Sequence, residues 1–149
     1  MSSNNEFDVG ISDFITENKI AAVCCVDSEH RPYTFHCFYA FDELNQLLFF
    51  KSSLQTLHSQ LLAENPHIAG SILPAKLDML ALKGVQFTGK ILYDGIPGKI
   101  NPEVFFHLRL PLALTKPGKV YCIQLETIKM TDNSKIFGKK FLWNKYELV

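Results

Sequence analysis

The sequence predicts a mainly β protein, a small antiparallel barrel of about six strands with peripheral helices. Six apolar runs of strand length support this, and they lie at 20–26, 33–41, 47–51, 67–73, 82–93 and 120–133. Gly84 and Gly89 fall inside the fifth run, where glycine favours a bend or a close backbone approach. The sixth run contains a one-residue slip in its apolar pattern, which is typical of a β-bulge. Bends and bulges curve a sheet towards closure, so a barrel is favoured over a sandwich.

Length and charge limit the classes of function. At 149 residues, 47% of them hydrophobic, the chain fits a single domain spanning 1–149. Fifteen basic side chains balance fifteen acidic ones, so no net field attracts nucleic acid or an anionic membrane, and we expect neither partner. The first ten residues lack the basic and apolar regions of a signal peptide, and no apolar run is long enough to span a bilayer. We therefore expect a cytoplasmic protein.

A short amphipathic helix is expected before the first strand. Ile11, Phe14 and Ile15 recur at helical spacing, and Asp8 or Ser12 can cap the helix. The next three apolar runs are joined by short polar turns, which predicts an antiparallel meander.

Alternation in the second strand, 33–41, separates two faces. Phe35 and Cys37 share one face with the other odd-numbered residues, whereas His36 and Phe38 share the other face with Thr34.

A second helix is predicted over about 53–64, directly after the third strand. Leu54, Leu57 and Leu61 form its apolar stripe, and the Asn65-Pro66 pair ends it.

The third helix is predicted to begin at Asn101 as N-cap, with Pro102 in the first position. His107 and Arg109 then fall near its C-terminus, where cations suit the helix dipole, so we assign them no further role. In the last strand, Tyr121, Ile123 and Leu125 hold one parity, whereas later apolar residues hold the other; this is the slip that predicts the bulge.

The four cysteines, Cys24, Cys25, Cys37 and Cys122, lie in predicted strands without C-x-x-C spacing. A chain of this size needs no disulfide staples, so reduced, buried thiols are the favoured interpretation. We expect no metal site, although a reactive cysteine paired with a histidine stays open.

The stretch FFKSSLQTLHSQLLAENP, residues 49–66, carries the main functional signal. A strand passes into a helix through Lys51, Ser52 and Ser53, with Thr56 and His58 in the first helical turns. An ordinary helix cap explains this pattern, and so does a pocket for an anion such as phosphate.

Four strings carry a resemblance to a known family: CFYAFD (37–42), KGVQFTGKI (83–91), IKMTDN (128–133) and FGKKFLW (137–143). With these strings in this order, the chain resembles the pyridoxamine 5′-phosphate oxidase-like FMN-binding split barrels, in particular a small bacterial subfamily of them. The resemblance implies a homodimer with FMN between the two subunits. It also implies that the flavin phosphate lies where the third strand meets the following helix.

By this resemblance, the hydroxyls of Ser52, Ser53 and Thr56 and the side chains of Lys51 and His58 contact the phosphate. The better-known oxidases carry an Arg–Lys pair in the first helical turns, where this chain has Leu57 and His58.

The resemblance further implies that His36, Cys37 and Phe38 face the isoalloxazine ring, largely through main-chain groups. A strand histidine is otherwise usually structural. Gln86 is expected either to hydrogen-bond the flavin or to be a solvated amide on the sheet surface.

Near the C-terminus, Trp143 is expected either to stack over the partner subunit's flavin or to close the core. Lys139 and Lys140 are expected either to favour negative charge on the flavin or the phosphate, or to be ordinary surface charges.

These features favour an FMN-dependent oxidoreductase or flavin reductase of unassigned substrate, with NADH or NADPH as a reductant. No carboxylate pair or catalytic triad is recognisable, which suits a site where the flavin performs the electron transfer and no catalytic residue is assigned. The alternative is a non-catalytic, stress-related module that holds flavin or another ligand, such as haem, without turnover.

Overall fold

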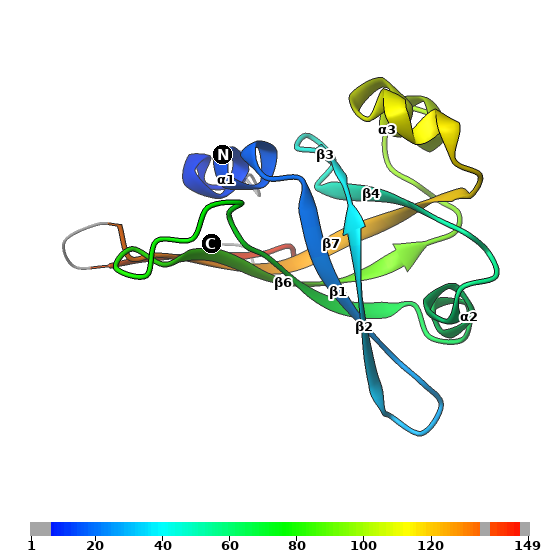
Figure 1. Cartoon of the computed structure of the whole chain (residues 1–149), viewed down its shortest axis with the longest axis horizontal. Coiled ribbons are helices and arrows are strands. Elements are labelled where there is room, and N and C mark those ends of the chain that lie inside the picture. Colours follow the sequence, from blue (N-terminus) through cyan, green and yellow to red (C-terminus); the bar gives the residue numbers. More distant parts are fainter. Residues whose placement is uncertain (1–6, 135–137, 147–149) are drawn as a thin grey trace.

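The computed structural model describes residues 7–134 and 138–146 and consists of one curled antiparallel sheet with helices around it (Figure 1). Within these residues the sheet has eight strands: β1 (Ile20–Val26), β2 (Pro32–Phe38), β3 (Ala40–Asp42), β4 (Leu47–Ser52), β5 (His67–Ile72), β6 (Lys83–Leu92), β7 (Lys119–Asp132) and β8 (Lys139–Asn144). The helices are α1 (Val9–Glu17), α2 (Leu57–Glu64), α3 (Pro102–Arg109) and a 3-10 helix, η1 (Pro111–Thr115). The predicted mainly β, antiparallel fold class is confirmed.

The longest strand, β7, organises the sheet. The strand order is β2-β1-β5-β6-β7-β4-β3, and β8 also pairs with β7. One edge of β7 pairs with β6 along nearly all its length. The other edge is shared, because the first half of β7 pairs with β4 and the second half pairs with β8. β7 therefore connects the part of the sheet that contains β4 and β3 with the part that contains β8.

The predicted bulge in this strand is confirmed. Thr88 pairs with Thr127 and Gly89 pairs with Leu125, so Glu126 is an extra residue on the β7 side. It lies between the part of β7 that pairs with β4 and the part that pairs with β8. The extra residue turns the strand, so that apolar side chains on both sides of it stay in the core.

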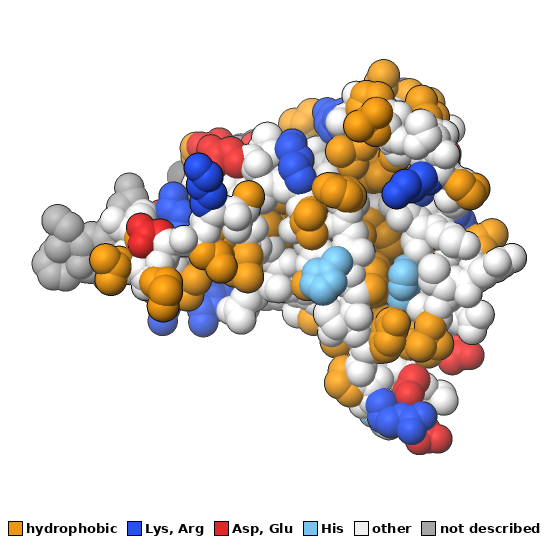
Figure 2. All heavy atoms as spheres, viewed as in Figure 1, with side chains coloured by type: hydrophobic (Ala, Val, Ile, Leu, Met, Phe, Trp, Pro, Cys, Tyr) orange, Lys and Arg blue, Asp and Glu red, His pale blue; other side chains and the backbone are white. Residues whose placement is uncertain are grey.

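The helices cover the ends and one side of the sheet. In Figure 1, α1 lies over one end of the barrel, α2 lies at the opposite end beside β5, and α3 projects beyond β3 and β4. The space-filling view shows hydrophobic side chains gathered around α3 (Figure 2). No helix in the described part of the chain combines the length and the apolar character needed to cross a membrane.

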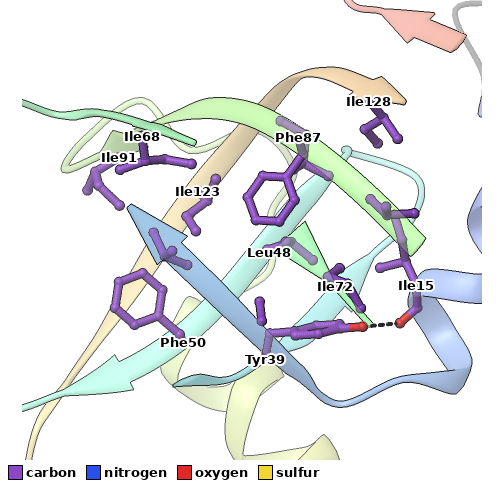
Figure 3. Close-up of a cluster of buried hydrophobic side chains, with 14 of the residues drawn as sticks. Ile15, Tyr39, Leu48, Phe50, Ile68, Ile72, Phe87, Ile91, Ile123 and Ile128 are labelled. Carbon is purple, nitrogen blue, oxygen red and sulfur yellow. Dashed lines mark hydrogen bonds between the residues drawn. The ribbon is translucent and has the colours of Figure 1, made fainter. Parts of the chain in front are cut away.

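Two hydrophobic clusters stabilise the chain. The larger fills the barrel and includes Phe50, Ile72 and Phe87, which come from three different strands (Figure 3). The smaller packs α3 against the outer side of β4 and β7 through residues such as Phe49 and Phe105, whose ring centroids are 5.1 Å apart. α3 is therefore anchored to the same strands that shape the barrel.

The predicted second strand, 33–41, is interrupted at Tyr39 and becomes β2 and β3. The backbone N–H of Tyr39 donates to the Lys19 carbonyl at 3.0 Å. Its buried hydroxyl donates to the Ile15 carbonyl at 2.6 Å, which ties this corner to α1 (Figure 3). The chain then leaves β1 and pairs with β4. The predicted alternation holds, because Phe35 is buried while His36 and Phe38 are exposed.

The second helix begins later than the sequence predicts. α2 starts at Leu57 with Thr56 as its N-cap, so residues 53–55 are not helical. The predicted Leu54 and Leu57 contacts are wrong, because both side chains are exposed; Leu62 is instead fully buried. The pattern misleads because Leu54 lies outside the true helix, which begins at Leu57. The side of α2 that packs on the core carries Leu62, with Leu61 partly buried beside it.

The structure adds β8, which the sequence pattern does not predict. Its alternation is weak, because Lys139, Lys140 and Asn144 dilute a run in which Trp143 is the buried anchor. Pairing with β7 then determines its conformation, as tertiary contacts often do for short strands.

Gly89 faces the bulge at a distance that leaves no room for a side chain. A Cβ atom there would lie 2.4 Å from the carbonyl oxygen of Gln124. We expect Gly89→Ala to lower the free energy of unfolding by about 2–3 kcal/mol, because the β6–β7 ladder must shift to relieve the clash. Urea unfolding measures this loss.

Gly84→Ala is the matched control in the same strand. Its Cβ would meet the Cδ2 methyl of Leu73 at 3.2 Å, and this exposed side chain can move. We expect a loss below about 1.5 kcal/mol. Equal losses for the two variants would contradict a special role for the Gly89 approach.

Candidate functional site

A pocket of about 570 Å³ lies where the barrel is split. β2 and β4 face each other there, with the rings of Phe35 and Phe50 at 5.6 Å, but the strand order contains no β2–β4 ladder. His58 of α2 borders the pocket on one side of the split, and the α3–η1 segment borders it on the other. The described lining residues are Phe35, His36, Cys37, Phe38, Phe50, Lys51, Ser52, Ser53, His58, Phe106, Arg109, Leu110, Pro111, Leu112, Ala113, Lys116 and Pro117.

The start of α2 forms a corner of the pocket that is rich in hydroxyl groups. Ser52 Oγ lies 2.6 Å from His58 Nε2, and both side chains line the pocket. Ser53, also in the lining, is exposed. The first two peptide N–H groups of α2 have no helical carbonyl to bond, and the positive end of the helix dipole lies at this corner. The corner is chemically suited to an anion.

Thr56 lies behind this corner and acts as the cap of α2. Its Oγ1 accepts from the Ser59 N–H at 3.2 Å and lies 2.8 Å from Ser59 Oγ and 3.0 Å from the Ser53 carbonyl. The sequence pattern offered Ser53 as the helix cap, which is wrong, because Thr56 is the N-cap of α2. Thr56 is absent from the described pocket lining, and its contact with a phosphate stays a prediction. By fixing the turn, it positions Ser53 and His58.

His58 is held in one orientation. Its ring stacks on Phe35 with centroids 3.8 Å apart and an interplanar angle of 8°. Burial disfavours the charged imidazolium and lowers the pKa of His58 below its ordinary value of 6.5. At neutral pH the side chain is therefore a neutral imidazole that bonds Ser52 and stacks on an aromatic ring. Leu57 precedes His58 at the two positions compared above with an Arg–Lys pair. Its side chain is half-exposed and absent from the described pocket lining.

Lys51 points to the other side of the pocket from Ser52, because neighbouring residues of a strand project to opposite faces. Its Nζ donates to the Ala113 carbonyl at 2.9 Å and lies 3.0 Å from His107 Nε2. His107 Nδ1 faces the Glu103 carbonyl at 2.8 Å, so this nitrogen carries the proton and Nε2 accepts from the ammonium group. Lys51 therefore links β4 to α3 and η1.

Arg109 and Lys116 also line the pocket, and the sequence interpretation missed both. Arg109 lies in the last turn of α3, as predicted, but its position there also brings it to the pocket. Its guanidinium carbon lies 3.7 Å from the centroid of the Phe105 ring. The helical spacing of Arg109 from Phe105 and Phe106 could have indicated that Arg109 lies beside a buried face of the helix. The sequence does not reveal, however, that α3 packs beside the split.

The three predicted ring-contact residues, His36, Cys37 and Phe38, all line the pocket. β2 pairs with β1 on one edge, and in the described sheet order its other edge is unpaired, so main-chain groups of this segment face the split. Burial raises the pKa of Cys37 to about 12. Cys37 is therefore a thiol, not a nucleophilic thiolate, at neutral pH.

Three other predicted site residues, Gln86, Lys140 and Trp143, are absent from the described pocket lining. Gln86 is exposed on β6 and is separated from His36 by Ala22 and Ser71 across the sheet, which is roughly 14 Å at ordinary strand spacing. Lys140 is exposed on β8. The side chain of Lys139 lies outside the described part of the structure.

Trp143 packs in the core. It is 8% exposed, and its ring meets Phe7 edge-on with centroids 4.5 Å apart. This is the core-closing role of the two that the sequence allowed, while stacking on a partner's flavin stays a prediction.

The pocket as a whole is apolar, aromatic and free of acidic side chains among its described lining residues. The surface between α3 and α2 carries hydrophobic, histidine and basic side chains (Figure 2). Its chemistry suits a ligand with an apolar or aromatic body and negative charge. The described residues contain no group of three His, Cys, Asp or Glu side chains arranged to hold a metal ion.

The curled sheet and its open join between β2 and β4 define a split β-barrel with a pocket at the split. No family model matches the chain. It is 29% identical over 144 residues to a UPF0306 protein from Yersinia pestis bv. Antiqua (strain Angola), an alignment that covers 97% of this chain and 98% of the relative.

Solved structures confirm the fold. A heme binding protein from Mycobacterium smegmatis matches with a TM-score of 0.72 and 13% identity, over 89% of this chain but only 55% of its own. A pyridoxamine 5′-phosphate oxidase-related, FMN binding protein from Nostoc punctiforme PCC 73102 matches with a TM-score of 0.63 and 9% identity, over 91% of this chain and 88% of that one. The predicted resemblance is confirmed at the level of fold, and the two matching proteins are described as binding different groups, heme and FMN.

The lowered pKa of His58 predicts a loss of stability in mild acid. The unfolded chain binds a proton near pH 6.5, whereas the folded chain resists protonation until a lower pH. Between these two values the unfolded state holds more protons, so the contribution of His58 to stability falls as the pH falls below about 6.5. NMR titration of the ring protons, assigned with His58→Asn, should give a midpoint below 6.5.

Urea unfolding at pH 7.5 and 5.5 provides a second measurement. The wild-type protein should lose more stability on acidification than His58→Asn, because the variant lacks this proton uptake on unfolding. A midpoint at or above 6.5 would contradict the buried, stacked environment of the ring.

Proposed function

We propose that the chain binds FMN in the pocket at the split and acts as a flavin-dependent oxidoreductase. One observation carries this proposal: a single pocket joins an anion-suited corner, made by Ser52, Ser53 and His58, to aromatic and apolar walls. A flavin mononucleotide has the matching parts, a phosphate and a planar ring system. The FMN binding protein from Nostoc punctiforme, which shares the fold, supports the choice of ligand.

The phosphate would lie at the start of α2. The peptide N–H groups of Leu57 and His58 and the hydroxyls of Ser52 and Ser53 can donate to it. A bound phosphate also favours protonation of His58, which then contributes a charge-assisted hydrogen bond. These groups replace part of what an Arg–Lys pair provides in the better-known oxidases. Lys51, which the family resemblance places at the phosphate, points instead towards α3 and η1, where it contacts His107 and the Ala113 carbonyl.

The ring would lie along β2. The unpaired edge of this strand offers peptide N–H and C=O groups from residues 36–38, and Phe38 and Phe106 provide apolar surface. FMN, once bound, supplies the electron-transfer chemistry. The residues of this chain bind and orient it, and none is assigned as acid or base, because the described lining holds no carboxylate and Cys37 is a thiol.

A homodimer is part of the proposal. α3 covers the outward face of the sheet over β4 and β7. Elsewhere in the described structure this face carries exposed apolar side chains: Ile20 (48% exposed), Phe38 (60%) and Leu142 (77%). A second copy on this face would bury these side chains and bring C-terminal residues such as Lys140 towards a neighbouring pocket. Size-exclusion chromatography with light scattering measures the mass, which should be twice that of the 16.9 kDa chain.

A second candidate is a non-catalytic module that holds haem. His36 is exposed on the pocket wall, where an imidazole can coordinate an iron atom, and the heme binding protein from Mycobacterium smegmatis shares the fold. Parallel titrations separate the two candidates. A Soret shift on adding haem that is lost in His36→Ala, together with no uptake of FMN, would favour this candidate.

For the leading proposal, we expect the wild-type protein to bind FMN and Ser52→Ala/His58→Asn to bind it roughly ten- to a hundredfold more weakly, because charge-assisted hydrogen bonds to the phosphate are lost. Riboflavin, which lacks the phosphate, should bind the two proteins nearly equally. Quenching of flavin fluorescence measures both affinities. Reduction of the bound flavin by NADH or NADPH then tests for oxidoreductase activity.

The matched control is Ser28→Ala/His30→Asn, which changes the same residue types in the exposed β1–β2 hairpin. It should bind FMN as the wild type does. A wild-type protein that ignores FMN would overturn the proposal, and equal weakening of FMN and riboflavin would overturn the placement of the phosphate.

A further inference from the structure

The α3–η1 wall of the pocket carries a positive charge that nothing in the described lining neutralises. Arg109 and Lys116 line this wall, and neither forms an ion pair within 4.0 Å with a carboxylate among the described residues. The chain as a whole has equal numbers of basic and acidic residues. Local accumulation of one sign in an apolar pocket raises the local concentration of ligands of the opposite sign.

Arg109 is held in place by a contact that leaves its charge intact. Its guanidinium stacks on the Phe105 ring at 3.7 Å, and Phe105 is buried against β4. A stacked guanidinium keeps its N–H donors in the plane of the group, where they can bind a carboxylate or phosphate with two parallel bonds. The ring therefore orients the donors without neutralising them.

This wall is held against the barrel. Lys51 donates to the Ala113 carbonyl in η1 and contacts His107 in α3. Phe106 adds a fully buried anchor in the cluster beneath the helix. Lys116 follows directly after η1, and its backbone N–H donates to the Ala113 carbonyl at 3.2 Å. The cations thus extend from a wall that the structure fixes at several points.

The cationic wall is distinct from the corner proposed for the flavin phosphate. Ser52 projects towards His58 and α2, whereas the neighbouring Lys51 projects towards α3 and η1. The two donor groups therefore approach the pocket from opposite faces of β4. A single phosphate at the Ser52 corner would leave Arg109 and Lys116 without an anionic partner.

We infer that Arg109 and Lys116 form a second anion subsite, which binds the acidic group of a small organic acid beside the flavin. Phe106, Leu110 and Leu112 provide the apolar surface for the body of this molecule. The inference deepens the proposed function, on which the identity of the neighbouring flavin rests. It assigns the substrate class as a carboxylate- or phosphate-bearing organic molecule and excludes neutral or cationic ones.

Benzoate and its neutral counterpart benzamide test this subsite. With the FMN-loaded protein at fixed ionic strength, calorimetric titration should show that benzoate binds roughly tenfold or more tightly than benzamide, because a charged hydrogen-bonded pair is involved. Arg109→Gln/Lys116→Gln should remove this preference and leave FMN affinity unchanged. Lys76→Gln/Lys99→Gln, which removes two exposed charges outside the described pocket lining, should keep it.

Two results would overturn the inference: equal binding of benzoate and benzamide to the wild type, or a preference that survives in Arg109→Gln/Lys116→Gln. If the preference survives and the variant also loses FMN affinity, the cations serve the flavin phosphate instead. If the wild type takes up no FMN, the same titrations are performed without it. A benzoate preference that the variant loses then supports the subsite while the flavin proposal fails.

Discussion

The close approach of β6 and β7 at the bulge is the constraint on which the architecture depends. Glu126 adds one residue to β7 exactly opposite a glycine, and the backbone at Gly89 comes too near Gln124 for any side chain. The two halves of β7 can then face different partners, β4 before the bulge and β8 after it. A straight β7 would place one of these halves with its apolar residues outside, because a slip of one residue reverses the faces of a strand.

The pocket follows from this curvature and from Tyr39. Curvature brings β4 round to face β2, and the interruption at Tyr39 lets β3 pair with β4 while β2 stays with β1. β2 and β4 are thus close but share no ladder. In a closed barrel these edges would pair with each other. Here the rings of Phe35 and Phe50 meet in place of a ladder, and the second edge of β2 is unpaired in the described sheet. The split and the pocket therefore both result from the curvature of the sheet and the interruption at Tyr39.

The sequence predicts the parts of this structure that depend on local pattern. The bulge is visible in the parity of β7, the caps of α1 and α3 in Asp8 and Asn101, and the corner at Ser52 and Ser53 in a strand that ends in hydroxyls. Features set by packing are less visible. β8 is stabilised by pairing with β7, and the contribution of Arg109 to the pocket depends on where α3 packs, a contact between residues far apart in the chain.

The two walls of the pocket differ in the kind of charge they present to a ligand. The α2 wall offers hydroxyls, peptide N–H groups and a neutral imidazole, which present dipoles and no full charge. The α3–η1 wall offers the full charges of Arg109 and Lys116, and Lys51 of β4 holds this wall in place. The first wall is formed at the β4–α2 junction of the barrel, whereas the second belongs to the α3–η1 segment, which packs on the outside of β4 and β7. A change of residues in the α3–η1 segment can therefore alter the charge of the pocket while the β4–α2 junction stays the same. Solved structures of similar fold are described as binding heme or FMN.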